Sequence, residues 1–172
     1  MSTKTKNQIN SFLSFRIGSE VFAANVRNVL NILEMTKITK VPKASSYMKG
    51  VINLRGNVLP IIDSRLKFGL EETEYTTNTC IIVLELHIGN DPITVGAIVD
   101  SVNEVLEIDD DNILPPPGIG TNFRSDFLKG MAKKDEGFIM LLDVEKVFAT
   151  DEVVDIQNIT EEISKQTTAE QS

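Results

Sequence analysis

Residues 48–63 have the sequence MKGVINLRGNVLPIID, and this stretch decides how the chain folds. Apolar and polar residues alternate on both sides of Gly56-Asn57, a pair that can supply the positive φ angles of a two-residue turn. The pattern predicts a β-hairpin with strands over residues 50–55 and 58–62. Asp63 follows the second strand, where its carboxylate can accept the free amide hydrogens that begin a short helix.

Much of this stretch returns eighty residues later in the chain. The pairs at this offset are residues 47–51 (YMKGV) with 127–131 (FLKGM) and 61–63 (IID) with 141–143 (LLD). Upstream, at an offset of seventy-three residues, the apolar spacing of 24–33 matches that of 97–106. A unit that occurs twice predicts two copies of one small fold rather than a solenoid. Two packed copies leave a seam between them, and we expect a partner to bind at that seam.

The remaining pattern predicts an all-β protein. Alternation predicts strands over residues 13–17 and 21–23, and residues 26–33 predict one helical turn that runs into a strand. In the second copy we expect strands at 80–88, 93–99, 102–108, 127–133 and 137–142, and a helix at 144–149 capped by Asp143. Many short strands joined by glycine turns favour small β-barrels over a parallel sheet.

Composition narrows the class of protein. The net charge of −8, much of it carried by residues 151–172, opposes nucleic acid or an anionic membrane as the main partner. The single cysteine, Cys80, lies in an apolar run, which predicts a buried thiol in a reducing compartment. No secretory signal and no apolar run of membrane-spanning length is present, so we expect a soluble cytoplasmic protein with no membrane insertion.

Catalytic and metal-binding patterns are weak. Asp63 and Asp143 occupy equivalent repeat positions, as in a two-lobed aspartic protease, but neither is followed by the glycine such a site needs. Helix capping explains both aspartates. Residues 109–112 (DDDN) are similar to a calcium loop, yet Leu114 stands where the loop requires glycine. With His87 as the only histidine, we expect a binding protein without catalytic residues, metal or cofactor.

Residues 48–63 closely resemble the signature of the CheW-type chemotaxis coupling proteins. Further motifs of that family are Phe12-Leu13-x-Phe15, Val41-Pro42, Val95-Gly96-x-x-Val99-Asp100 and Phe127-Leu128-x-Gly130. The resemblance covers about residues 12–150 and implies a CheW-like domain of two five-stranded SH3-like β-barrels with short helices. We expect barrel 1 over about 15–75 and barrel 2 over about 80–150, with the chain ends completing the barrels. We expect residues 1–11 to be flexible and the acidic residues 151–172 to be partly helical.

The resemblance implies an adaptor rather than an enzyme. Family members couple the cytoplasmic hairpin tip of chemoreceptors to the regulatory domain of the histidine kinase CheA, in arrays at the membrane. An alternative is another small-barrel protein-interaction module of a two-component pathway. A nucleic-acid-binding small barrel would need a basic groove with exposed aromatics, which the negative charge and the 6% aromatic content oppose. An acid-type hydrolase would use the paired aspartates.

The receptor site follows from what a helical hairpin needs: a groove with aliphatic walls and a polar anchor. Arg55, at the hairpin turn, can project its guanidinium outward and form forked hydrogen bonds. By resemblance, the other receptor-binding residues are Asn53, Gly56, Val26, Val29, Asn31, Ile32 and Val105. Val26, Val29, Ile32 and Val105, expected as groove walls, could each equally be core residues.

Two positions depart from the family pattern. Asn31 stands where many members have a glutamate that can pair with the arginine, so Asn31 can accept a hydrogen bond but carries no charge. Leu114 replaces a position that is often basic. Leu114 and Ile119 mark the contact that the resemblance implies with the kinase in receptor arrays.

Overall fold

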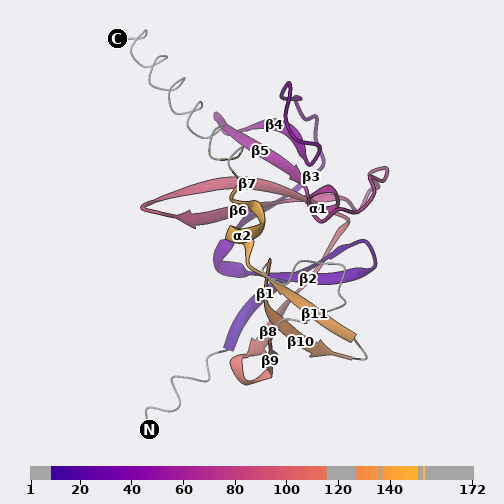
Figure 1. Ribbon diagram of the computed structural model, residues 1–172, viewed down its shortest axis with the longest axis vertical. Helices are drawn as coiled ribbons and strands as arrows, with labels where there is room; N and C mark the ends of the chain where they lie inside the picture. The colour runs from indigo at the N-terminus through magenta and orange to yellow at the C-terminus, as the bar shows by residue number, and fades with distance from the viewer. Residues whose placement is uncertain (1–8, 116–126, 136, 151–152, 154–172) are drawn as a thin grey trace.

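Two β-sheets, one above the other along the long axis, make up the computed structural model, which describes residues 9–115, 127–135, 137–150 and 153 (Figure 1). The strands are β1 (Ile9–Ile17), β2 (Glu20–Asn25), β3 (Val29–Glu34), β4 (Met48–Leu54), β5 (Asn57–Asp63), β6 (Cys80–Ile88), β7 (Asp91–Val99), β8 (Ser101–Asp109), β9 (Ile113–Leu114), β10 (Leu128–Lys134) and β11 (Gly137–Leu142). The helices are α1 (Ser64–Lys67) and α2 (Val144–Phe148), with 3-10 turns η2 (Val26–Asn28) and η3 (Asp110–Asn112). The all-β prediction is confirmed.

The sheets exchange strands between the two copies of the repeat. One sheet has the order β8-β1-β2-β11-β10-β9 and the other the order β3-β6-β7-β5-β4. The first hairpin of each copy therefore lies in the sheet that the other copy mainly forms. This exchange corrects the expected division into residues 15–75 and 80–150. Because β2 is paired on one edge by β1 and on the other by β11, β3 pairs with β6 instead.

The repeat inferred from the sequence is preserved in the hydrogen bonding. Both long hairpins, β4–β5 and β10–β11, carry a bulge at the same place, before Gly50 and before Gly130. The amide of Asp63 donates to the Tyr47 carbonyl over 2.8 Å, and the amide of Asp143 donates to the Phe127 carbonyl over the same distance. The short strand β9, paired with β10, makes the first sheet six-stranded where five strands were expected.

The turn between β4 and β5 contains Arg55 and Gly56, not Gly56 and Asn57 as predicted. Their φ angles are 55° and 86°, so both residues are left-handed. The side-chain oxygen of Asn53 accepts a hydrogen bond from the Gly56 amide over 2.8 Å and closes the turn. The prediction was wrong by one residue because it placed the glycine first in the turn, whereas this turn has it second.

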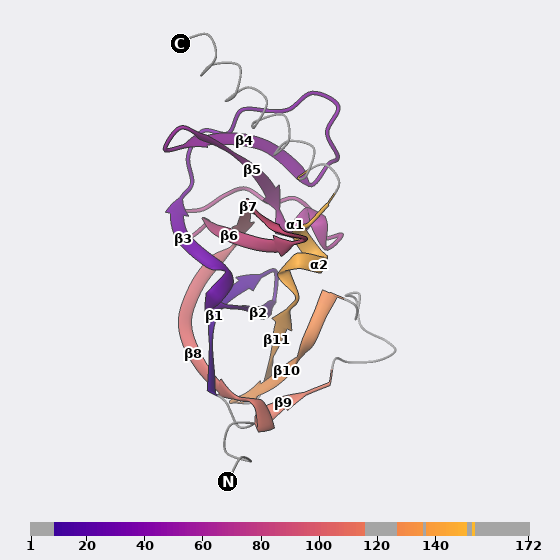
Figure 2. The ribbon, with the colours of Figure 1, turned by 90° about the vertical axis from the view of Figure 1, so that its left-hand side faces the viewer.

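The expected seam between the copies is filled by apolar side chains. A central cluster draws on β1, β2, β6, β7 and α2, and it buries Phe22 and Phe148 almost completely. Helices α1 and α2 lie at the level where the sheets meet (Figures 1 and 2). Asp100 adds two polar contacts. Its carboxylate accepts one hydrogen bond from the Gly18 amide (2.8 Å) and one from the Arg65 guanidinium (2.7 Å).

Asp63 and Asp143 cap helices, as predicted. The Asp63 carboxylate accepts from the amides of Arg65 (2.9 Å) and Leu66 (3.4 Å), and its other oxygen accepts from the Tyr75 hydroxyl (3.1 Å). Asp143 accepts from the Lys146 amide over 3.3 Å. Burial, followed by the charge of Asp63 and the hydrogen bond to it, raises the pKa of Tyr75.

Replacing Asp63 by alanine is expected to lower the free energy of unfolding by about 0.5–2 kcal/mol. A loss in the upper half of that range is expected, because the buried carboxylate also accepts a hydrogen bond from the Tyr75 hydroxyl. Urea denaturation measures the change, and Asp143→Ala is the matched control, since Asp143 makes one capping bond and is only half-buried. An Asp143→Ala variant that loses as much stability as Asp63→Ala would show that the tyrosine contact contributes nothing.

The structure also tests the predictions for the acidic run at residues 109–112 and for Cys80. Asp109 accepts a hydrogen bond from the Asp111 amide over 3.0 Å, so the acidic run begins the η3 turn. Cys80 is half-buried rather than buried, because it is the first residue of β6, and its thiol donates to the Asn78 carbonyl. In the part of the chain that the structure describes, no helix has the length and apolarity needed to cross a membrane. The predicted helix in residues 151–172 lies outside the described residues, Val153 excepted.

Candidate protein-interaction site

Arg55 stands at the tip of the β4–β5 hairpin with its side chain exposed. It makes no hydrogen bond or ion pair with any residue that the structure describes. Its positive φ angle is one that residues other than glycine rarely adopt, and the Asn53–Gly56 hydrogen bond helps to hold the turn there. The guanidinium is therefore held on an ordered turn and is free to bind a partner.

Arg55 borders a hollow of about 630 Å³ on a face of the five-stranded sheet, which we call the arginine hollow. Its other lining residues are Leu30 and Asn31 of β3, Val83 of β6, Thr94 of β7, and Leu54, Asn57, Val58 and Leu59 of the hairpin. Most of these side chains are aliphatic. The hollow thus combines apolar walls with one unpaired cation.

Asn31 shares the arginine hollow with Arg55 but is not paired with it. The Asn31 side-chain oxygen accepts a hydrogen bond from the amide of Ile32 over 2.8 Å. That acceptor is therefore engaged with its own strand. A partner of Arg55 has to come from outside the described part of this chain.

Leu30 is a lining residue that the sequence interpretation missed. The pairing of β3 with β6 shifts register between Val29 and Asn31, which makes Leu30 the extra residue of a bulge. Its side chain is 53% exposed and lines the arginine hollow. The only signal in the sequence is that Val29 and Leu30 are adjacent apolar residues where a strand would alternate.

The four valine and isoleucine positions expected in the groove lie outside the lining of the arginine hollow. Val26 and Val29 are half-buried, and Val29 packs against the central cluster. Ile32 and Val105 are 42% and 59% exposed, on β3 and β8 respectively. These two strands are edges of different sheets and lie on the same side of the molecule (Figure 2). Ile32 and Val105 are therefore exposed apolar residues on this side of the molecule, and neither lines the arginine hollow.

Leu114 belongs to the other sheet. It lies in β9, opposite Met131 of β10, and its side chain is 43% exposed. It borders a separate hollow of about 490 Å³ together with Glu107, Asp111, Lys133 and others. The expected kinase contact is thus distinct from the arginine hollow, and Ile119 lies outside the described residues.

Two small β-sheets that exchange strands form the fold of a CheW-like domain. The family model of that domain matches residues 11–152, and the chain belongs to this family. The chemotaxis protein CheW of Rhizobium meliloti is 35% identical over 140 residues, which cover 81% of this chain and 88% of that protein. CheW of Klebsiella aerogenes is 31% identical over 148 residues, which cover 86% of this chain and 87% of that protein.

A solved structure agrees with the fold. The crystal structure of the scaffolding protein TtCheW from Thermoanaerobacter tengcongensis superposes with a TM-score of 0.74 at 29% sequence identity. The match covers 84% of this chain and 95% of that one. The resemblance stated from the hairpin motif is therefore confirmed: the chain belongs to the CheW family.

Proposed function

We propose that this chain is a non-catalytic adaptor that couples chemoreceptors to the histidine kinase CheA in the cytoplasm, at membrane-bound receptor arrays. Family membership supports the adaptor role. The main observation behind the proposal is the environment of Arg55. This residue is exposed and unpaired among the described residues, and the turn that holds it lies at the rim of an aliphatic hollow.

The receptor contact is proposed at the arginine hollow. A helical hairpin tip presents an apolar stripe beside polar groups, and such a stripe binds where apolar walls and a directed donor occur together. Leu30, Leu54 and Leu59 supply the apolar surface. Arg55 supplies forked donors for a carboxylate or a carbonyl of the receptor. Asn53 and Gly56 contribute by fixing the turn that presents the arginine.

The kinase contact is proposed on the other sheet, at Leu114. Leu114 and Phe138 are exposed by 43% and 51%, on β9 and β11 of the six-stranded sheet. The proposal rests on the family resemblance, because single exposed apolar residues are common on protein surfaces. A receptor contact on one sheet and a kinase contact on the other would let one molecule hold both partners at once. Ile119 stays a prediction for the same contact.

Co-sedimentation with soluble receptor signalling fragments and the kinase tests the coupling. We expect the kinase to sediment with the receptor fragments, and to be stimulated, only when this chain is present. Omitting the receptor fragments while keeping the kinase is the matched control. If the chain binds the kinase but not the receptor fragments, it is another interaction module of a two-component pathway, and the coupling proposal is wrong.

A further inference from the structure

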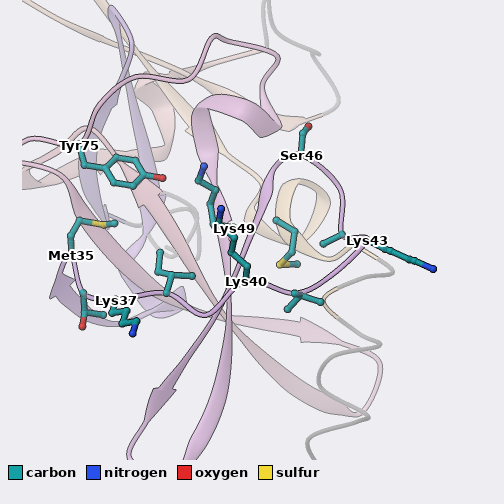
Figure 3. Close-up of a pocket in the computed structure, with 12 residues that line it drawn as sticks. Met35, Lys37, Lys40, Lys43, Ser46, Lys49 and Tyr75 are labelled. Carbon is teal, nitrogen blue, oxygen red and sulfur yellow. The ribbon is translucent and has the colours of Figure 1, made fainter.

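A third hollow, of about 700 Å³, is formed mainly by the segment that connects β3 to β4, and we call it the lysine hollow (Figure 3). Its lining residues are Met35, Thr36, Lys37, Ile38, Lys40, Val41, Lys43, Ala44, Ser46, Met48, Lys49 and Tyr75. Lys37 and Lys43 lie towards opposite ends, with Lys40 and Lys49 between them (Figure 3). The proposed coupling role uses none of these residues.

The lysine hollow has more cations than the described acids neutralise. Lys49 is ion-paired with Glu72, and its hydrogen bond and charge, followed by the weaker influence of Lys40, lower the pKa of Glu72. Lys37, Lys40 and Lys43 form no hydrogen bond or ion pair with the residues that the structure describes. The surroundings therefore favour an anionic occupant, and methionine and aliphatic side chains among the lysines favour one with an apolar side.

The last described residue, Val153, shares an apolar cluster with residues that line this hollow. Val153 is fully buried in the central cluster, which also contains Met48. Met48 lines the lysine hollow, and so does Ala44, which packs against the same cluster. Val153, the last described residue, therefore belongs to a cluster that borders the lysine hollow. Even at the helical rise of 1.5 Å per residue, residues 154–172 extend about 28 Å, which is enough to cross a hollow of this size.

The composition of residues 154–172 matches the lysine hollow in charge and in apolar spacing. The segment contains Asp155, Glu161, Glu162 and Glu170 against the single Lys165. Its apolar residues Ile156, Ile159 and Ile163 recur at intervals of three and four, the spacing that places side chains on one face of a helix. An acidic segment with one apolar face complements lysines around an apolar floor.

We propose that the lysine hollow is the binding site for residues 154–172 of the same molecule. Covalent attachment gives the tail a high effective concentration at the hollow, so weak contacts are enough to keep it occupied. The tail then competes with any acidic segment of another protein for the same lysines. Because of this competition, access to the lysine hollow would depend on the salt concentration and on the charge of the tail.

Zero-length carbodiimide crosslinking of the full chain, followed by mass spectrometry, tests the proposal. Crosslinks are expected from the lysines at 37–49 to the carboxylates at 155–170, and their yield should fall as salt is raised. The Lys49–Glu72 ion pair provides an internal positive control, because it must crosslink wherever the reaction works. A mixture of isotopically light and heavy protein separates crosslinks within one molecule from those between two copies.

Charge reversal makes the test specific. In the double variant Lys40→Glu, Lys43→Glu, crosslinks from the tail to the remaining Lys37 and Lys49 are expected to fall about ten-fold, because several weak attractions become repulsions. Adding Glu161→Lys and Glu162→Lys to that variant is expected to restore crosslinking between tail and hollow with the groups reversed, from the new amines at 161 and 162 to the new carboxylates at 40 and 43.

The matched control is Lys129→Glu, Lys133→Glu, which changes the same total charge away from the lysine hollow. It should leave the crosslinks unchanged. Three outcomes overturn the proposal: no tail crosslinks beside a normal Lys49–Glu72 crosslink, crosslinks only between copies, or a yield that charge reversal at the hollow does not alter.

Discussion

Replacing Gly50 by alanine is expected to lower the free energy of unfolding by about 3 kcal/mol or more. Gly50 has a φ angle of 145°, and a β-carbon there would lie 2.0 Å from the backbone oxygen of Thr39. That oxygen accepts from the Val51 amide (2.8 Å), and the Val51 carbonyl accepts from the Thr39 amide (2.9 Å). The alanine methyl group would force these two segments apart and break both bonds. Urea denaturation measures the loss.

Substitutions at two other glycines distinguish the two causes of this loss, the steric clash and the positive φ angle. At Gly130, the equivalent position of the second copy, a β-carbon would lie 2.6 Å from the Leu114 carbonyl oxygen, but the φ angle is not positive. Gly89 has a φ of 63° with open space around it. Gly89→Ala is therefore expected to cost only about 1–2 kcal/mol from the left-handed backbone, and Gly130→Ala only the steric part. Equal losses for Gly50→Ala and Gly89→Ala would contradict the close-approach argument.

The second large effect is on binding. Arg55→Glu is expected to weaken binding of a soluble receptor signalling fragment by about 2 kcal/mol or more, roughly thirty-fold in Kd. The change removes the forked donor and places a negative charge at the rim of the arginine hollow. Thermal stability should hardly change. Arg55 has no partner in the described chain, and a left-handed backbone conformation costs glutamate about as much as arginine. Titration calorimetry and a thermal melt measure the two quantities.

Arg16→Glu is the matched control for this prediction. Arg16 is also exposed, but it lies on β1 of the six-stranded sheet, away from the arginine hollow. The same change of charge there should leave receptor binding unaltered. Arg55→Lys should fall between the wild type and Arg55→Glu, since lysine keeps the charge but not the planar fork. Wild-type affinity in Arg55→Glu would show that the receptor binds elsewhere.

The parts of the structure that could be predicted are local. The β4–β5 hairpin, the helical turn that runs from Val26 into β3, and the caps at Asp63 and Asp143 each depend on residues close in sequence. The repeat was also visible, because equivalent bulges and turns need equivalent glycines and aspartates. The exposed position of Arg55 followed from its place beside the turn glycine.

The parts that could not be predicted depend on pairing between distant segments. The sequence of β3 predicts a strand, but not that β6 is the strand that pairs with it. The bulge that exposes Leu30 is set by that pairing. The separation of Ile32 and Val105 from the arginine hollow likewise depends on which strands become edges. A family resemblance supplies the architecture but not these individual side-chain positions.

The exchange of strands also affects how the chain can be synthesised and divided. The N-terminal hairpin β1–β2 finds its neighbours only when β8 and β11 have been made, near the far end of the chain. Such pairing between remote segments slows folding, because a long loop must close before the contacts form. A nascent N-terminal half would leave the ribosome without its partner strands. Neither half of the gene product would be an independent folding unit, and only the two together could assemble the native sheets.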